Sequence, residues 1–274
     1  MITINDIQAA IKKEADAARV LENAKAAHEA AQVTFNDVHG MDYHLTKIFC
    51  KRGDTNAETA LASNEGENVR AAFDKYVRAN ERAAVYGQYM RMLVHCFKVQ
   101  VKQIVGAALD AHSNEWIDKP AHYKRTHAIL VSIAQDALSA AGVDGVGVYV
   151  YDNGYKGAMH DTCVCFTCSL RAVDFKSSRG ECVDMQVRMY GNRDHDPDTL
   201  YNENFTHWYG DCSMADALQI DAREIMRLAR SYARDIKRIE HENIRYNAAV
   251  SDIERKYAFM GVTDDFYKAR LIAH

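Results

Sequence analysis

A polar loop in the second half of the chain carries the residue types of a divalent-metal site. Carboxylates and imidazoles are common ligands of such ions. The stretch 191–212 contains His195, Asp196 and His207. Pro197 makes Asp196 an equally natural turn residue. The loop is therefore a metal site or a solvated, partner-binding loop, and the second is what we expect.

A second set of charged residues lies at the ends of two expected strands. Asp152 ends one strand, and Asp174-Phe175-Lys176 follows the next. This pattern resembles the acidic and D-x-K elements of the PD-(D/E)xK nucleases, in which carboxylates hold magnesium and a lysine helps position the attacking water. The resemblance implies a metal-dependent nuclease or hydrolase that uses Asp152, Asp174 and Lys176. The family's usual proline before the first aspartate is absent, since Tyr151 stands there.

Three of the seven cysteines, Cys163, Cys165 and Cys168, lie close together. On a strand the first two share one face and the third takes the other, so their thiolates do not converge on one metal ion. Free cysteine is often buried, and we expect core packing here. An odd number of scattered cysteines also predicts reduced thiols rather than a disulfide framework.

Basic residues recur on one side of the expected C-terminal helix. Between Arg223 and Arg238 there are six basic residues and two acidic ones. The basic residues fall opposite the apolar positions and form a cationic stripe that could bind a phosphate backbone or an acidic protein surface. The alternative is a solvated helix face with i,i+4 ion pairs. The candidate binding residues are Arg223, Arg227, Arg230 and Arg234.

Aromatic residues gather in the loop before that helix, where they could anchor a protein partner or pin the loop onto the sheet. They are Tyr201, Phe205, Trp208 and Tyr209.

Long helices are expected to position these residues. Apolar spacing predicts a helix from about Asn5 to Gln32, a break near His39-Gly40 and a polar loop to about Gly66. A second helix is predicted over 67–112 and should be buried on most sides between Tyr89 and Leu109. A third is predicted over 121–141. Two prolines in the whole chain suit such uninterrupted helices.

The pattern then changes to short extended runs. The runs 146–151, 163–173 and 182–190 are separated by turn signals and predict a three-stranded antiparallel meander. A small sheet needs cover, so helices should pack on it. The fold class is therefore α+β and helix-dominated.

The last helix is predicted to run unbroken from Ser213 to Met260 with apolar residues alternating by four and three. The helix over 67–112 has the same 3.5-residue period and would be about 69 Å long, more than the roughly 37 Å breadth of a compact domain. Part of it should project and need a partner, so we expect a homo-oligomer, a dimer or higher even assembly. The expected interface residues of the last helix are Ile225, Tyr232, Ile236, Ile239, Asn243, Tyr246, Val250 and Ile253.

Composition fits an ordinary globular chain. The 274 residues are 48% hydrophobic and 26% charged, with a formal net charge of −4. The charge gives no global attraction to nucleic acid. No secretory signal or membrane span is recognised, which predicts a soluble cytoplasmic protein. No phosphate-binding loop, dinucleotide-binding turn or hydrolase elbow occurs, so no cofactor is expected.

The sequence predicts three regions: helical over 1–115, small α+β over 116–213, and a coiled-coil-like helix with a tail over 214–274. Our first hypothesis is a non-enzymatic, homo-oligomeric protein-binding module, such as a phage or mobile-element accessory protein that inhibits a host protein. The alternatives are the metal-dependent nuclease and a nucleic-acid binder that uses the basic stripe.

Overall fold

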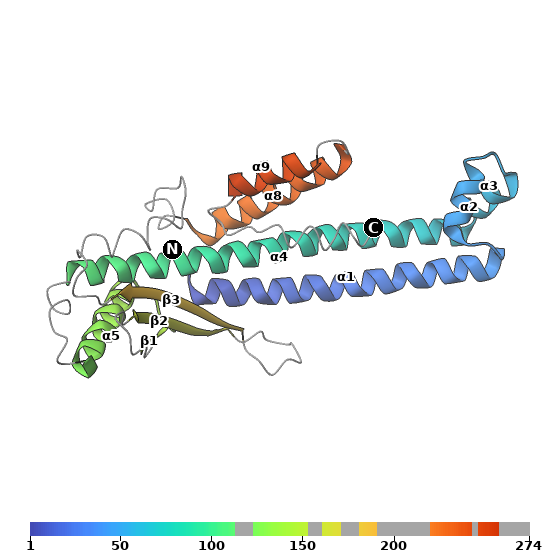
Figure 1. The fold of residues 1–274 in the computed structure, drawn as a ribbon. Helices are drawn as coiled ribbons and strands as arrows, with labels where there is room; N and C mark the ends of the chain where they lie inside the picture. The colour runs from blue at the N-terminus through green and yellow to red at the C-terminus, as the bar shows by residue number, and fades with distance from the viewer. Residues whose placement is uncertain (113–122, 153–160, 171–180, 191–219, 243–245, 258–274) are drawn as a thin grey trace. The chain divides into compact units, whose positions relative to one another are not determined.

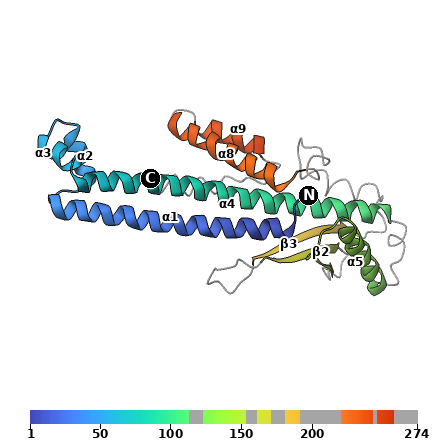
Figure 2. The same ribbon diagram turned by 180° about the vertical axis from the view of Figure 1, so that it is seen from behind.

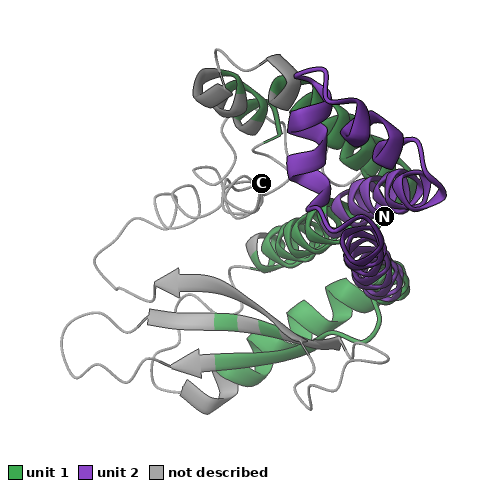
Figure 3. Cartoon of the chain, turned by 90° about the vertical axis from the view of Figure 1, so that its right-hand side faces the viewer, with its two compact units in different colours: residues 1–11, 88–274 green, residues 12–87 purple. Residues whose placement is uncertain are grey.

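The computed structural model describes residues 1–112, 123–152, 161–170, 181–190, 220–242 and 246–257. The helix-dominated character predicted from the sequence is confirmed. Contacts divide the chain into two compact units, residues 12–87 and residues 1–11 with 88–274 (Figure 3). Two long helices pass through both units, and each unit is described separately below.

Unit 2, residues 12–87, combines parts of the long helices α1, Ile4–His39, and α4, Asn64–Ala111. Within this unit the two helices run side by side (Figures 1 and 2). The His28 ring stacks on Tyr76, with centroids 6.0 Å apart, and tilts against Phe73 at 5.3 Å. A core of Phe35, Tyr43, Ala60 and Val69 fixes the end of the unit at which α1 finishes.

The break predicted at His39-Gly40 is confirmed, and α1 continues to His39 rather than ending near Gln32. Gly40 has a φ of +63°, which a side chain with Cβ rarely adopts, so it stops the helix.

The prediction of an irregular loop from Gly40 to Gly66 is wrong, because this stretch contains two short helices, α2, Tyr43–Cys50, and α3, Thr55–Leu61. Asp42 and Asp54 cap them: each carboxylate accepts two hydrogen bonds from backbone N–H groups of the first turn. Helices of one to two turns are too short to show a periodic apolar pattern, and caps and core contacts stabilise them.

Unit 1 is built around the second half of α4. Burial of this segment on most sides, predicted from its apolar composition, is confirmed, since Met92, Leu93, Phe97, Val101 and Val105 are all fully buried. Helix α5, Tyr123–Ala140, packs on strand β1, Gly147–Asp152. Strand β1 pairs antiparallel with β2, Asp161–Leu170, and β2 pairs antiparallel with β3, Glu181–Tyr190. Val164 and Phe166 of β2 are buried.

The first residues of the chain are held to the middle of α4. The N–H of Ile2 donates to Oε1 of Gln100 at 2.9 Å, and Nε2 of Gln100 donates to the carbonyl of Ile220 at 3.2 Å. Thr3 and Asp6 then exchange side-chain and backbone hydrogen bonds in a capping box that starts α1. One buried amide therefore joins segments 98 and 120 residues away in sequence.

The prediction of one unbroken helix from Ser213 to Met260 is wrong. Helix α8, Ala222–Glu242, and helix α9, Tyr246–Tyr257, fold back on each other (Figure 1). Nζ of Lys256 lies 3.3 Å from Asp235, and the rings of Tyr232 and Tyr257 meet edge to face at 5.2 Å. On a straight helix, residues 235 and 256 would be about 31 Å apart.

The apolar seam of this segment is therefore covered within one chain. Seven of its described members lie at most 7% exposed: Ile225, Ala229, Tyr232, Ile236, Ile239, Ile253 and Tyr257. Asn243 and the side chains of Tyr246 and Val250 lie outside the described residues. A heptad pattern specifies a buried stripe, and a second helix of the same chain buries it as well as a second chain does.

We predict that Ile236→Ala lowers the free energy of unfolding by about 2–5 kcal/mol, because it leaves a cavity in the seam between α8 and α9. Urea unfolding followed by circular dichroism measures this loss. The loss should be the same at every protein concentration. A loss that changes with concentration would place this seam between chains and contradict the hairpin.

We predict that Gln100→Ala costs about 1–3 kcal/mol, because the buried N–H of Ile2 and carbonyl of Ile220 lose their partner. Gln135→Ala, which removes an exposed glutamine from α5, is the matched control and should change the unfolding free energy by less than about 0.5 kcal/mol. Equal effects of the two substitutions would show that the Gln100 amide does not join these segments.

Candidate functional site

The start of α8 is set by Asp221. Its Oδ1 accepts hydrogen bonds from the backbone N–H groups of Arg223 and Glu224, both at 2.9 Å. The hydrogen bond from the Glu224 N–H has the largest effect on the pKa of the Asp221 carboxyl. Together with the bond from Arg223 it holds this pKa below its usual range, because both bonds stabilise the charged form. The cap fixes where the helix begins and therefore which way its side chains point.

Helix α8 has two opposite faces. The buried seam lies on one, and five arginines separated by four, three, four and four residues lie on the other. All five side chains are exposed, as their positions opposite the seam predict. We call this row the arginine face: Arg223, Arg227, Arg230, Arg234 and Arg238. Fifteen residues at about 1.5 Å each give the row a length of about 22 Å.

One arginine of this face is partly neutralised. Arg227 donates two hydrogen bonds to Glu224, from Nε to Oε2 at 2.7 Å and from Nη2 to Oε1 at 2.5 Å. These bonds lower the pKa of Glu224 and raise that of Arg227. Both side chains remain accessible to solvent, so the pair is weak and a stronger anion can displace it.

The other arginines keep their charge available. Among the side chains that the structure describes, no carboxylate forms an ion pair with Arg230, Arg234 or Arg238. Asp235, the other described acid in this part of α8, turns to α9, where Lys256 and the hydroxyl of Tyr257 each contact it at 3.3 Å. Within the described side chains, the arginine face is thus a row of guanidinium groups in which Arg227 is paired with Glu224.

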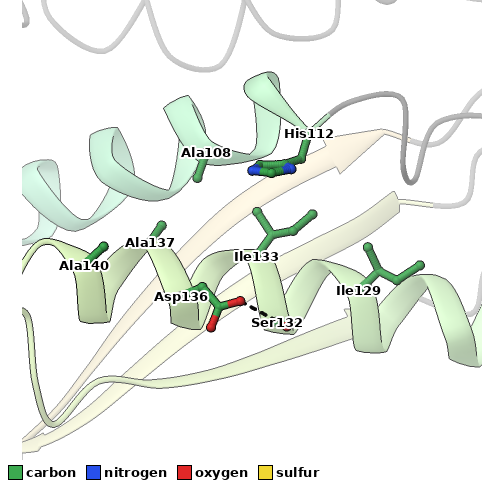
Figure 4. Close-up of a pocket in the computed structure, with 8 residues that line it drawn as sticks. All are labelled: Ala108, His112, Ile129, Ser132, Ile133, Asp136, Ala137 and Ala140. Atoms are coloured by element: carbon green, nitrogen blue, oxygen red, sulfur yellow. Dashed lines mark hydrogen bonds between the residues drawn. The ribbon is translucent and has the colours of Figure 1, made fainter.

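A hollow of about 430 Å³ lies between the end of α4 and α5 (Figure 4). Its lining is mostly aliphatic, with the His112 ring above Ile133. The Ser132 hydroxyl donates to the Asp136 carboxylate at 3.3 Å, and this carboxylate turns along α5 rather than toward His112. The hollow therefore pairs the Ser132 hydroxyl with a carboxylate of its own helix, and that carboxylate does not orient the His112 ring as the acid of a triad does.

Ser63, His39 and Glu65 lie close together in unit 2. Nε2 of His39 is 3.0 Å from the Ser63 hydroxyl and 3.6 Å from Glu65. A hydrolytic triad needs the acid on the other ring nitrogen, and here both contacts use Nε2. The Ser63 hydroxyl also donates to the Ala60 carbonyl at 2.7 Å and accepts from the Gly66 N–H at 3.2 Å. The group therefore caps the start of α4.

Most other site residues predicted from the sequence lie outside the described residues. Of the nuclease candidates, Asp152 is the last residue of β1, and its side chain is not described. The predicted residues outside the described ranges are Asp174, Lys176, His195, Asp196, Tyr201, Phe205, His207, Trp208 and Tyr209.

The described thiols and possible metal ligands give no redox or metal centre. Burial raises the pKa of the Cys96 thiol to about 12, so it stays protonated and unreactive. Cys163, Cys165 and Cys168 lie on β2, with side chains that are not described. Within the described part of the chain, no three metal-ligating residues converge. The helices described there include none apolar enough over a sufficient length to cross a bilayer.

No protein-family model matches the chain. No curated protein and no solved structure matches it either.

Proposed function

We propose that this protein binds nucleic acids through their phosphate backbone, with the arginine face of α8 as the contact surface. The observation that carries the proposal is the row of five exposed guanidinium groups opposite a buried seam. Guanidinium presents a planar fork of donors that fits two phosphate oxygens, which favours arginine over lysine at such contacts.

The linear shape of the row favours an extended polyanion. A compact phosphate ligand would need its cationic groups to converge on one point, whereas these five are spread over about 22 Å. A nucleic-acid strand carries a charge at every nucleotide, with a rise of about 3.4 Å per nucleotide in B-form DNA. Several phosphates can therefore face the row at once, and each contact releases counterions.

The buried seam disfavours an anionic membrane as the partner. Helices that bind a membrane surface insert their apolar face beside the headgroups that their cations contact. Here Ile225, Tyr232 and Ile236 are at most 1% exposed. The basic side of α8 is therefore available without an accompanying apolar side.

Contacts to phosphate position a protein on nucleic acid and carry no base sequence by themselves. The proposal is therefore binding without strong sequence preference. The protein-binding module and the metal-dependent nuclease remain predictions, because the loop aromatics and the carboxylates on which they depend lie outside the described side chains.

We predict that replacing Arg223, Arg230, Arg234 and Arg238 by glutamine weakens binding to labelled single-stranded DNA, duplex DNA and RNA oligonucleotides. Fluorescence anisotropy over a salt series measures the effect. The slope of log affinity against log salt concentration should become shallower by about 3, since each lost phosphate contact removes about 0.7–0.9. The protein should remain folded, because all four side chains are exposed.

The matched control removes four exposed positive charges elsewhere, by changing Lys12, Lys13, Lys75 and Arg78 to glutamine. It alters the net charge equally and should leave most of the affinity and salt slope. If the two variants lost the same affinity for the oligonucleotides, the loss would come from net charge alone, and the arginine face would not be the binding site. The proposal would also be wrong if polyglutamate competed as well as nucleic acid does, or if the protein bound anionic vesicles more tightly than nucleic acid. The partner would then be an acidic protein or a membrane surface.

We predict that Glu224→Gln strengthens binding to the same oligonucleotides and steepens the salt slope by up to about 0.9, because it frees Arg227 for a phosphate. The variant Asp252→Gln is a matched control, since it removes the i,i+3 partner of Arg255 on α9 without altering the arginine face. Tighter binding by both variants to the same extent would point to net charge alone.

A further inference from the structure

Helix α2 presents an apolar face to solvent. Leu45, Ile48 and Phe49 are 51%, 46% and 40% exposed. They stand at positions i, i+3 and i+4, so they share one side of the helix. The other side faces the core of unit 2 through Tyr43 and Thr46, which are 4% and 0% exposed. One side of the helix is thus buried in the core, and the opposite, apolar side is open to solvent.

The exposed face is not needed to hold the helix in place. The Asp42 carboxylate caps α2, and the Tyr43 ring packs edge to face on Phe35 at 5.1 Å. A single exposed apolar residue is ordinary on a protein surface, but three neighbours on one short helix form a patch of the kind found in interfaces. The patch is therefore a surface on which a partner can dock.

We propose that a second copy of this chain covers this face, with the two α2 helices packed antiparallel across a two-fold axis. The helix has opposite charges at its two ends: the exposed N-cap Asp42 at the N-terminal end and the exposed Arg52 just beyond the C-terminal end. In an antiparallel pair, the acidic end of each helix lies beside the basic end of the other, so opposite charges meet at two places. The helix dipoles also favour the antiparallel arrangement.

The residue spacing is self-complementary in the same arrangement. Positions 45 and 49 are symmetric about position 47, and so are positions 42 and 52. With the axis near position 47, Leu45 of one copy faces Phe49 of the other, and Asp42 faces Arg52. Ile48 lies next to the axis and meets its own copy. A single register therefore brings the apolar residues of the two copies into contact and also places their opposite charges side by side.

This surface is separate from the seam of α8 and α9, whose described apolar residues are already buried within one chain. It is also independent of the arginine face, and the two proposals can fail separately. Three apolar side chains on each copy make a contact smaller than the roughly 800 Å² per partner of a stable complex. The dimer should therefore form and dissociate with concentration.

Sedimentation velocity of the full chain over a range of concentrations tests the proposal. The unaltered protein should shift from monomer to dimer as its concentration rises. Ile48→Asp should weaken the dimer at least about tenfold, because it places two carboxylates at the centre of the contact. Val20→Asp is the matched control, since Val20 on α1 is 47% exposed, and it should dimerise normally. Far-ultraviolet circular dichroism should be the same for all three proteins.

A second pair of variants tests the register. Arg52→Glu should weaken the dimer by facing Asp42 with a like charge, whereas Lys51→Glu makes the same charge change at the neighbouring exposed residue and should have a smaller effect. A protein that stays monomeric at every concentration, or equal effects of Ile48→Asp and Val20→Asp, would overturn the proposal. Equal effects of the two glutamate substitutions would overturn the antiparallel register.

Discussion

A buried carboxamide, that of Gln100, is the interaction on which unit 1 depends. The side chain is 1% exposed, accepts from the N–H of Ile2 and donates to the carbonyl of Ile220. These two backbone groups lie next to the start of α1 and the start of α8. A polar group in an apolar core is costly unless it is hydrogen-bonded. The Gln100 amide and the two backbone groups satisfy one another's hydrogen bonds, and this holds the three segments together. The Asp221 cap follows directly after Ile220 and begins the helix that carries the arginine face.

The seam of α8 shows what a heptad pattern does and does not specify. Alternation by four and three predicts which residues are buried, and its described members are buried. It does not predict whether the covering helix belongs to the same chain. In this protein α8 ends at Glu242, and α9, which begins at Tyr246, packs back against it and contacts its seam at Tyr232. Neither proline nor glycine marks this reversal, since residues 243–245 are Asn-Ile-Arg, so sequence alone favours one straight helix.

Other parts of the fold follow from the sequence to different degrees. Helical character, the stop at Gly40 and the buried second half of α4 could be predicted, because they depend on composition, on periodicity over many residues and on a glycine. Helices α2 and α3 could not be found by periodicity, because they have only eight and seven residues. Their visible signals were Asp42 and Asp54, each followed by a helical turn that its carboxylate caps.

The candidate site also has features that the sequence could predict and features that it could not. The exposure of the arginines follows from their positions opposite the seam, so the basic stripe could be predicted with its residues. Which of them form ion pairs with the described carboxylates could not, because this depends on where those carboxylates turn. Glu224 pairs with Arg227, whereas Asp235 pairs with Lys256, a residue 21 positions further along the chain. That second pairing exists only because α8 and α9 form a hairpin.

The overall charge of the chain limits how the arginine face can act. With a net charge of −4, the protein as a whole repels a polyanion at long range. Salt at physiological concentration screens such repulsion beyond about 8 Å, while guanidinium groups in direct contact with phosphate act within hydrogen-bond distance. In the nucleic-acid binding that we propose, capture therefore depends on the local row and on its alignment along a strand. A row fixed on a capped helix, backed by a buried seam, keeps its charges in line before the ligand arrives, so less conformational entropy is lost on binding.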